Sequence, residues 1–183
     1  MRHKILMILV TVSASALGCS SVGAVPQTHP FSIHDMVAMD RISDPQVSPD
    51  GSQIVFVLRK TDMEANRGRT DLWLVSTTGG QPRRFTTHPD SDSNPRWAPD
   101  SRTIWFLSSR SGSSQVWTIS LDGGEATQVT DEPLDVSNLV VSPDGKHLAF
   151  TMSVFPGTTP AVTKEKLDEI EESPATGRIY DQI

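Results

Sequence analysis

A short turn sequence occurs three times along this chain, and its regular spacing limits the folds that the chain can adopt. The copies are Ser48-Pro49-Asp50-Gly51, Ala98-Pro99-Asp100-Ser101 and Ser142-Pro143-Asp144-Gly145. Proline presets φ at the second place of a turn, aspartate bonds to its own backbone, and glycine accepts a positive φ. Each copy lies between an extended segment and an apolar run, so each predicts a tight turn between two strands. Ser101 replaces the glycine and predicts slight strain in the second turn.

A second pattern repeats in step with these turns. Trp73 and Trp117 each lie in an apolar segment that leads to a glycine pair and then to a polar segment ending in threonine. We expect the pairs Gly79-Gly80 and Gly123-Gly124 to form hairpin turns. The tryptophans are 44 positions apart, as are the second and third turns, whereas the first two turns are 50 apart. We expect the extra residues to form a longer loop within residues 60–70, because lengthening a loop costs little closure entropy.

Four strands in roughly 44 residues are the period of a β-propeller blade. The chain is therefore predicted to be all-β, a partial β-propeller of about two and a half four-stranded blades with a short C-terminal helical insertion. The expected segments are a lead-in at 25–41, a propeller region at 42–152 with blades at 42–87, 93–130 and the start of a third at 137–152, and an acidic helical insertion at 153–183. An ordinary β-meander is the alternative, and the aligned turns argue against it.

Two further features concern the insertion and the core. Thr159 is predicted to cap a short amphipathic helix that has Pro160 at its first position. We expect its acidic residues, such as Glu171 and Glu172, to form a solvated face rather than a site for a substrate amine. The tryptophans recur at strand positions and are expected in the blade core, because buried aromatic residues dominate such interiors. They are Trp73, Trp97, Trp105 and Trp117.

The first 24 residues have the pattern of a secretory signal peptide. Arg2 and Lys4 precede an apolar run at residues 5–12, which is too short to span a bilayer. A buried N-terminal helix is the alternative, and the positive start argues against it. We therefore expect a protein that is exported from the bacterial cytoplasm.

The processing of this signal has two alternatives. Ala16-Leu17-Gly18-Cys19 resembles a bacterial lipobox, which would make residues 1–18 a lipoprotein signal and Cys19 a lipid anchor. Ordinary cleavage after Ala24 would instead release the protein into the periplasm. The expected location is therefore periplasmic or lipid-anchored to the bacterial envelope, with membrane attachment only through a lipidated cysteine.

Composition and motifs exclude several kinds of site. A net charge of −6 provides no basic surface for nucleic acid, and a single cysteine excludes a multi-cysteine zinc site. No Gly-x-Ser-x-Gly elbow or phosphate-binding loop occurs, and the five histidines lack metal-ligand spacing. Residues 90–94 resemble the start of a calcium loop, but Pro95 stands where glycine is required, so an inter-blade turn is expected. We predict no catalytic residue, no metal and no cofactor.

Two family resemblances follow from these patterns. The proline-aspartate turn, the apolar strand and the tryptophan-to-glycine segment look like blades of TolB-like propellers. A narrower resemblance extends over nearly all of the chain beyond the signal. It rests on residues 30–51 (PFSIHDMVAMDRISDPQVSPDG), residues 61–73, Thr163–Asp168 and Gly177–Asp181. These segments are similar to exported bacterial serine peptidases of the prolyl oligopeptidase family, in the dipeptidyl-peptidase and acylaminoacyl-peptidase branch.

The resemblance implies a propeller that caps a C-terminal α/β-hydrolase domain, admitting peptides and excluding folded proteins. In that family the catalytic serine, aspartate and histidine lie in the hydrolase domain, so none can be assigned to this sequence. We expect the substrate-gating N-terminal part of such a peptidase, inactive alone, with peptide substrates only in the full-length protein. The alternative is a periplasmic TolB-like propeller protein that binds a protein or envelope partner.

Overall fold

A computed structural model describes residues 30–172, and the predicted export signal, including Cys19, lies outside these residues. Its first four-stranded antiparallel sheet contains β1 (Arg41–Val47), β2 (Gln53–Asp62), β3 (Arg67–Ser76) and β4 (Arg83–Arg84). The second contains β5 (Asp92–Trp97), β6 (Thr103–Ser108), β7 (Gln115–Ser120) and β8 (Thr127–Gln128). A two-stranded sheet follows, formed by β9 (Ser137–Val141) and β10 (Leu148–Thr151).

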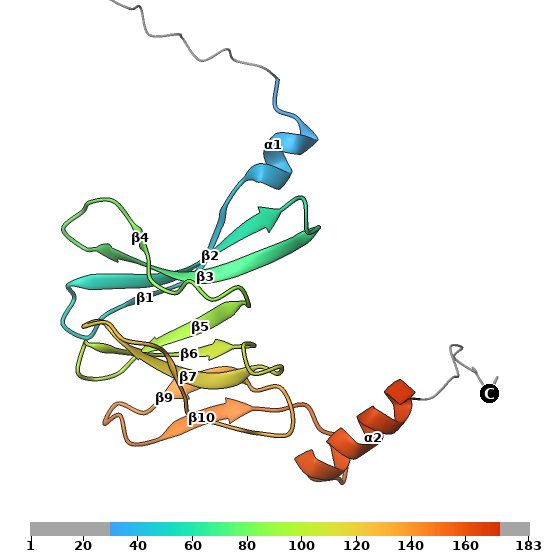
Figure 1. Cartoon of the computed structure of the whole chain (residues 1–183). Helices are drawn as coiled ribbons and strands as arrows, with labels where there is room; N and C mark the ends of the chain where they lie inside the picture. Colours follow the sequence, from blue (N-terminus) through green and yellow to red (C-terminus); the bar gives the residue numbers. More distant parts are fainter. Residues whose placement is uncertain (1–29, 173–183) are drawn as a thin grey trace, which may run out of the picture. The chain divides into compact units, whose positions relative to one another are not determined.

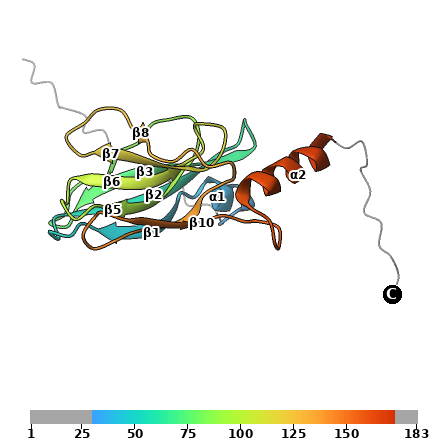
Figure 2. The same cartoon turned by 90° about the horizontal axis from the view of Figure 1, so that it is seen from below.

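In both larger sheets the strands are neighbours in chain order, as in a propeller blade. We call the three sheets blade one, blade two and blade three (Figure 1). The strand β5 of blade two contacts β1, β2 and β3 of blade one, and β9 contacts β5 and β6. Figure 2 shows the same stacking of blade two against blade one from a second direction. The predicted all-β fold with a partial propeller is confirmed.

The prediction of a longer loop within residues 60–70 is wrong. β2 and β3 are 10 residues each, against 6 for β6 and β7, and they remain paired as far as Asp62 and Arg67. The Asp62 carboxylate fixes the end of this hairpin, since it accepts hydrogen bonds from Ala65 N at 2.9 Å and Arg69 Nε at 3.1 Å. The polar composition suggested a loop, but strand pairing uses backbone groups and does not require apolar side chains.

The glycine pairs lie in the hairpin connections between the third and fourth strands, as predicted, and Gly79 N and Gly123 N close turns there with Ser76 O at 3.1 Å and Ser120 O at 3.3 Å. Each pair lies in the longer connection between β3 and β4 or between β7 and β8, with φ between 99° and 119°. The fourth strands are only two residues long. Their pairing is continued by a side chain, because Thr86 Oγ1 accepts the Leu72 N–H at 3.0 Å and Thr130 Oγ1 accepts the Val116 N–H at 2.9 Å.

The three proline-aspartate turns have the expected geometry. Hydrogen bonds close them from Gly51 N to Ser48 O, from Ser101 N to Ala98 O and from Gly145 N to Ser142 O, at 2.8, 3.1 and 2.9 Å. Ser101 has a φ of 57°, a region that is costly for a residue with a Cβ atom. Its hydroxyl accepts the Asp50 N–H of blade one at 3.0 Å, so the serine also joins two blades.

The aspartates of the first and third turns predict a dependence of stability on pH. The Ser48 hydroxyl donates to Asp50 at 2.6 Å and holds the pKa of this carboxyl below its usual range. Ser142 lowers the pKa of Asp144 in the same way. Because both folded-state pKa values lie below the unfolded value of about 4, each carboxylate stabilises the fold above that pH. This stabilisation is lost as the pH falls through the folded-state pKa.

We therefore expect the Asp50→Asn/Asp144→Asn variant to unfold at lower urea concentration than the original chain at pH 7. The difference in midpoint should shrink as the pH is lowered towards about 3, since the original carboxylates then become protonated too. Urea titrations monitored by tryptophan fluorescence at several pH values measure this difference. An equal difference in urea midpoint at pH 7 and at about pH 3 would show that ionisation of Asp50 and Asp144 does not contribute to stability.

The core lies between the blades. The first apolar cluster combines blades one and two, and its buried members are Val55, Val57, Leu72, Leu74, Trp97, Ile104 and Phe106. The second joins Leu107 and Val116 of blade two to Val136 and Leu139. Among the tryptophans predicted for the core, Trp97 is a buried member, while Trp117 and Trp105 are half-buried against the clusters. Trp73 is half-buried with the Lys60 ammonium over its ring, so it packs at an edge.

Two helices flank the strands. α1 (Ile33–Ala38), which the sequence did not predict, begins at a capping box in which Ser32 N donates to Asp35 Oδ2 at 2.7 Å. α2 (Pro160–Glu172) has the predicted start, with the Thr159 hydroxyl accepting from Val162 N at 3.4 Å. The acidic residues of α2 are solvent-exposed, apart from the half-buried Asp168. No helix within residues 30–172 has both the length and the apolar character needed to cross a membrane.

Candidate functional site

The first strand of each blade contains an Asx residue with positive φ. Asp44, Asn94 and Asn138 have φ values of 46°, 52° and 52°. At each position the pairing with the second strand of the blade shifts register, as at a β-bulge. Asparagine and aspartate tolerate this left-handed conformation better than most residues. The bulge leaves their side chains free to bond outside their own sheet.

Two of these Asx residues, Asp44 and Asn94, connect the blades. Asn94 Nδ2 donates to Asp44 Oδ2 of blade one at 3.3 Å, and Asn94 Oδ1 accepts the Leu139 N–H of blade three at 2.8 Å. Arg96 also pairs with Asp44, at 2.9 Å. One asparagine thus bonds to both neighbouring blades. The sequence patterns did not predict this role, although the repeated dipeptides Asp44-Pro45 and Asn94-Pro95 could have indicated it.

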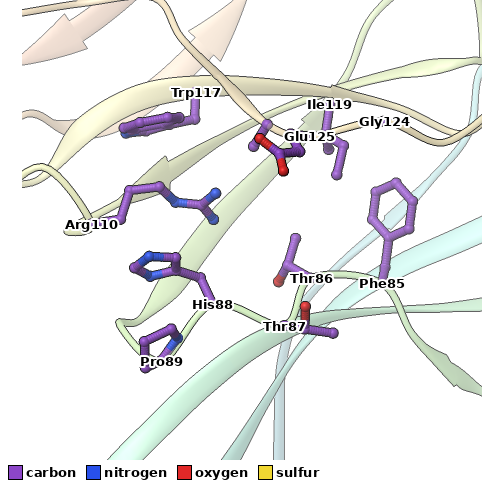
Figure 3. Close-up of a pocket in the computed structure, with 11 residues that line it drawn as sticks. Phe85, Thr86, Thr87, His88, Pro89, Arg110, Trp117, Ile119, Gly124 and Glu125 are labelled. Atoms are coloured by element: carbon purple, nitrogen blue, oxygen red, sulfur yellow. The ribbon is translucent and has the colours of Figure 1, made fainter.

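A cavity of about 520 Å³ lies between blades one and two. Its walls come from the segment after β4, from β7, and from the loop before β8 (Figure 3). Charged or polar side chains in the wall are those of Thr86, Thr87, His88, Arg110 and Glu125, and apolar ones are those of Phe85, Pro89, Trp117, Ile119 and Ala126. The volume is in the range of small-molecule sites.

Arg110 is the buried cation of this cavity. Its side chain is 13% exposed, and its Nη2 donates to both oxygens of the fully buried Asp92 carboxylate, at 2.9 and 3.0 Å. Nε donates to Ser108 Oγ at 2.8 Å, while Nη1 has no hydrogen-bond partner among residues 30–172. The guanidinium also lies over the Trp117 and Phe106 rings, 4.8 and 5.4 Å from their centroids. These contacts fix the orientation of the guanidinium.

Glu125 and His88 complete the polar part of the wall. The Glu125 carboxylate points into the space in front of the Arg110 guanidinium (Figure 3). Glu125 forms no ion pair or hydrogen bond through its side chain with any residue that the structure describes. His88 lies beside Arg110, and its Nδ1 accepts the Asp90 N–H at 3.2 Å. The cavity therefore presents two opposite charges that do not neutralise each other directly.

The histidines and the calcium-like segment lie as follows in the described residues. His147 is solvent-exposed, and in residues 30–172 no serine hydroxyl is bonded to a histidine ring. The calcium-like segment 90–94 runs into β5, and Asp92 is paired with Arg110 instead of facing solvent. In the described part of the chain, no three histidine, cysteine, aspartate or glutamate side chains are placed to hold a metal ion.

Comparison with known families agrees with this architecture. The sequence profile of the TolB beta propeller domain matches residues 36–176, which is more than half of the chain. The chain belongs to this family. The TolB-type propeller blades predicted from the repeat are confirmed.

Curated relatives of this TolB-type propeller are named as peptidases. It is 33% identical over 78 residues to peptidase YuxL of Bacillus subtilis, covering 43% of this chain and 12% of the relative. It is 28% identical over 107 residues to dipeptidyl-peptidase 5 of Porphyromonas gingivalis, covering 58% of this chain and 16% of the relative. The chain thus spans about a sixth or less of these relatives' length. The predicted resemblance to peptidases of this branch is confirmed.

Solved structures with the same fold come from peptidases and from TolB. The apo AtxE2 isopeptidase has a TM-score of 0.57 at 19% identity, covering 85% of this chain and 27% of that one. The Pyrococcus horikoshii acylaminoacyl peptidase has a TM-score of 0.54 at 20% identity, covering 67% and 20%. A putative TolB from Agrobacterium tumefaciens has a TM-score of 0.50 at 27% identity, covering 58% and 36%. At under 25% identity, the two peptidase structures establish only that this TolB-type propeller shares their fold.

Proposed function

We propose that this chain is the substrate-gating propeller part of an exported serine peptidase and does not hydrolyse peptides by itself. The observation that carries the proposal is the likeness to dipeptidyl-peptidase 5, which extends over 58% of the chain. Acyl transfer requires a nucleophile, a base and an oxyanion site close together. The described residues supply no such group, and the hydrolase would come from a separate domain. Peptides would then be substrates of the whole protein only.

The proposal predicts no peptidase activity for the purified chain. Chromogenic dipeptidyl and acyl-aminoacyl substrates should be turned over no faster than in buffer, and a serine-directed inhibitor should have no effect. A longer protein that continues into a hydrolase domain with a Gly-x-Ser-x-Gly elbow should cleave them. Inhibitor-sensitive turnover by the 183-residue chain alone would contradict the proposal.

A second candidate is a TolB-like propeller that binds a protein or envelope partner. The 27% identity to the Agrobacterium tumefaciens TolB favours it. The coding sequence downstream of Ile183 distinguishes the two functions. Further blades followed by a hydrolase domain would support the peptidase, and further blades followed by a stop codon would support the binding protein.

Export is part of both proposals, and Cys19 provides a test of its form. If the lipobox is used, the chain should fractionate with bacterial membranes, and Cys19→Ser should release it into the soluble periplasmic fraction. Mass spectrometry of the mature protein should then show a diacylglyceryl group on Cys19. A mature chain that begins after Ala24 would show ordinary cleavage instead.

A further inference from the structure

We propose that the cavity between blades one and two binds a small zwitterion with an apolar side chain, a free amino acid or a dipeptide. The proposal rests on a buried arginine with an unused donor group and a glutamate without a partner, both facing one cavity. It does not depend on the peptidase proposal, because it concerns only residues 85–126. Each part of the ligand is assigned to a different wall.

The carboxylate of the ligand is assigned to Arg110. Asp92 and Ser108 hold Nη2 and Nε, so the unpartnered Nη1 is kept in place by bonds that do not involve it. Nη1 is not one of the buried polar atoms that lack a partner in the described residues, so it is accessible from the cavity and can donate to a carboxylate oxygen that enters there. Figure 3 shows the guanidinium pointing towards the middle of the lining residues. The free Thr87 hydroxyl, which has no side-chain hydrogen bond among the described residues, lines the same space.

The ammonium group of the ligand is assigned to Glu125. This carboxylate lies on the loop before β8 and points into the cavity from the side opposite to Thr86 and Thr87 (Figure 3). No ion pair joins Glu125 to Arg110, so their charges are separated by space that a ligand can occupy. Filling this space with an ammonium group would neutralise Glu125 without displacing Asp92 from Arg110.

The charge balance of the cavity selects a zwitterion over a simple ion. The Arg110 charge is already compensated by Asp92 at 2.9 Å, so a plain anion would gain one donor group but would be repelled by Glu125. A plain cation would be attracted by Glu125 but would provide no acceptor for the Nη1 donor of Arg110. A ligand that carries both charges can pair with Arg110 and with Glu125 at the same time. Phe85, Ile119 and Ala126 then provide an apolar surface for its side chain.

Calorimetric titration of the full chain with four probes tests this assignment. The probes are L-leucine, glycyl-L-leucine, 4-methylpentanoate, which lacks the amine, and 3-methylbutylamine, which lacks the carboxylate. We expect at least one zwitterion to bind about tenfold more tightly than either singly charged probe, because it makes one more charged hydrogen bond than each of them. The tighter of the two zwitterions identifies the ligand as an amino acid or a dipeptide.

Two variants locate the binding. Glu125→Gln, on an exposed loop, should weaken binding of the preferred zwitterion about tenfold. Binding of 4-methylpentanoate should be unchanged or stronger. Arg110→Lys keeps a cation beside Asp92 but lacks the planar guanidinium group. It should therefore weaken the binding of both the preferred zwitterion and 4-methylpentanoate. Glu169→Gln on α2 is the matched control and should bind as the original chain does. Thermal melting checks that each variant is folded.

Two results would overturn the proposal. One is the absence of saturable binding for both zwitterions, or binding no tighter than that of the singly charged probes. The other is zwitterion binding that Glu125→Gln leaves unchanged, which would place the ligand elsewhere. Because Glu125 is exposed and makes no side-chain bond within residues 30–172, this variant remains informative even if Arg110→Lys fails to fold.

Discussion

Replacing Arg110 with alanine is expected to lower the free energy of unfolding by about 3–5 kcal/mol, the cost of breaking a buried ion pair. The Asp92 carboxylate is fully buried, and Arg110 is its ion-pair partner at 2.9 Å. Without the guanidinium, this carboxylate would remain charged and unpaired, or would have to take up a proton on folding. The contacts of the guanidinium with Trp117 and Phe106 would be lost as well. Both effects act in the same direction.

A matched substitution is available in the same blade. Arg102 pairs with Asp122, but these side chains are 65% and 63% exposed. Arg102→Ala should therefore change the free energy of unfolding far less than Arg110→Ala does, because solvent screens an exposed pair. Urea denaturation at pH 7, followed by tryptophan fluorescence, compares the two variants. Equal effects would mean that burial of the Arg110–Asp92 pair is not what makes it important.

Replacing Asn94 with alanine is expected to cost about 2–4 kcal/mol, because it combines the loss of two hydrogen bonds between blades with backbone strain. The side chain is the acceptor for the Leu139 N–H, and Leu139 is fully buried. Its Nδ2 bond to Asp44 would also be lost, which leaves Arg96 as the remaining side-chain partner of Asp44 in blade two. In addition, alanine would have to adopt the φ of 52° that asparagine tolerates.

Two further variants separate these contributions. Asn138→Ala places alanine at the same φ of 52° in blade three, where the asparagine bonds to Thr151 of its own blade. It should cost only about 1 kcal/mol, mostly from the backbone. Asn94→Gly relieves the backbone strain but does not restore the lost hydrogen bonds. Its cost in free energy of unfolding should therefore lie between those of Asn94→Ala and Asn138→Ala. If Asn94→Ala and Asn138→Ala had the same effect, the bonds between blades would not contribute.

Much of this fold could be predicted because its information is local. The proline-aspartate turns depend on the preferred φ values of four adjacent residues, and the structure closes each with a single hydrogen bond, as at Gly51 and Gly145. The apolar run of β6 was predicted to be a strand from its composition alone, and its Ile104 and Phe106 lie in the core. Repetition of these local features gave the period and hence the blade.

Local sequence patterns did not predict the elements whose formation does not depend on apolar side chains. The polar residues between Lys60 and Thr70 extend a hairpin, because their backbone groups pair as well as those of apolar residues. The α1 helix was missed because it is only six residues long, although Ile33, Met36 and Val37 have the spacing of one helix face and a capping box at Ser32 defines its start. The threonines that end blades one and two, Thr86 and Thr130, were predicted only as part of the repeat. In the structure their side chains accept backbone N–H groups of the third strands, where a longer fourth strand would otherwise pair.

The sequence by itself determined the turns, the blade period and the family resemblance, because each of these depends on residues close together in the chain. Only the tertiary structure decided which side chains join one blade to the next and which face the cavity. Arg110 and Asp92 lie on different strands or loops, and Asn94 bonds residues 50 positions before it and 45 after it. The Arg110–Asp92 pair forms when β5 pairs with β6 inside blade two, whereas the Asn94 bonds form when the blades stack, and no spacing along the chain specifies either contact beforehand.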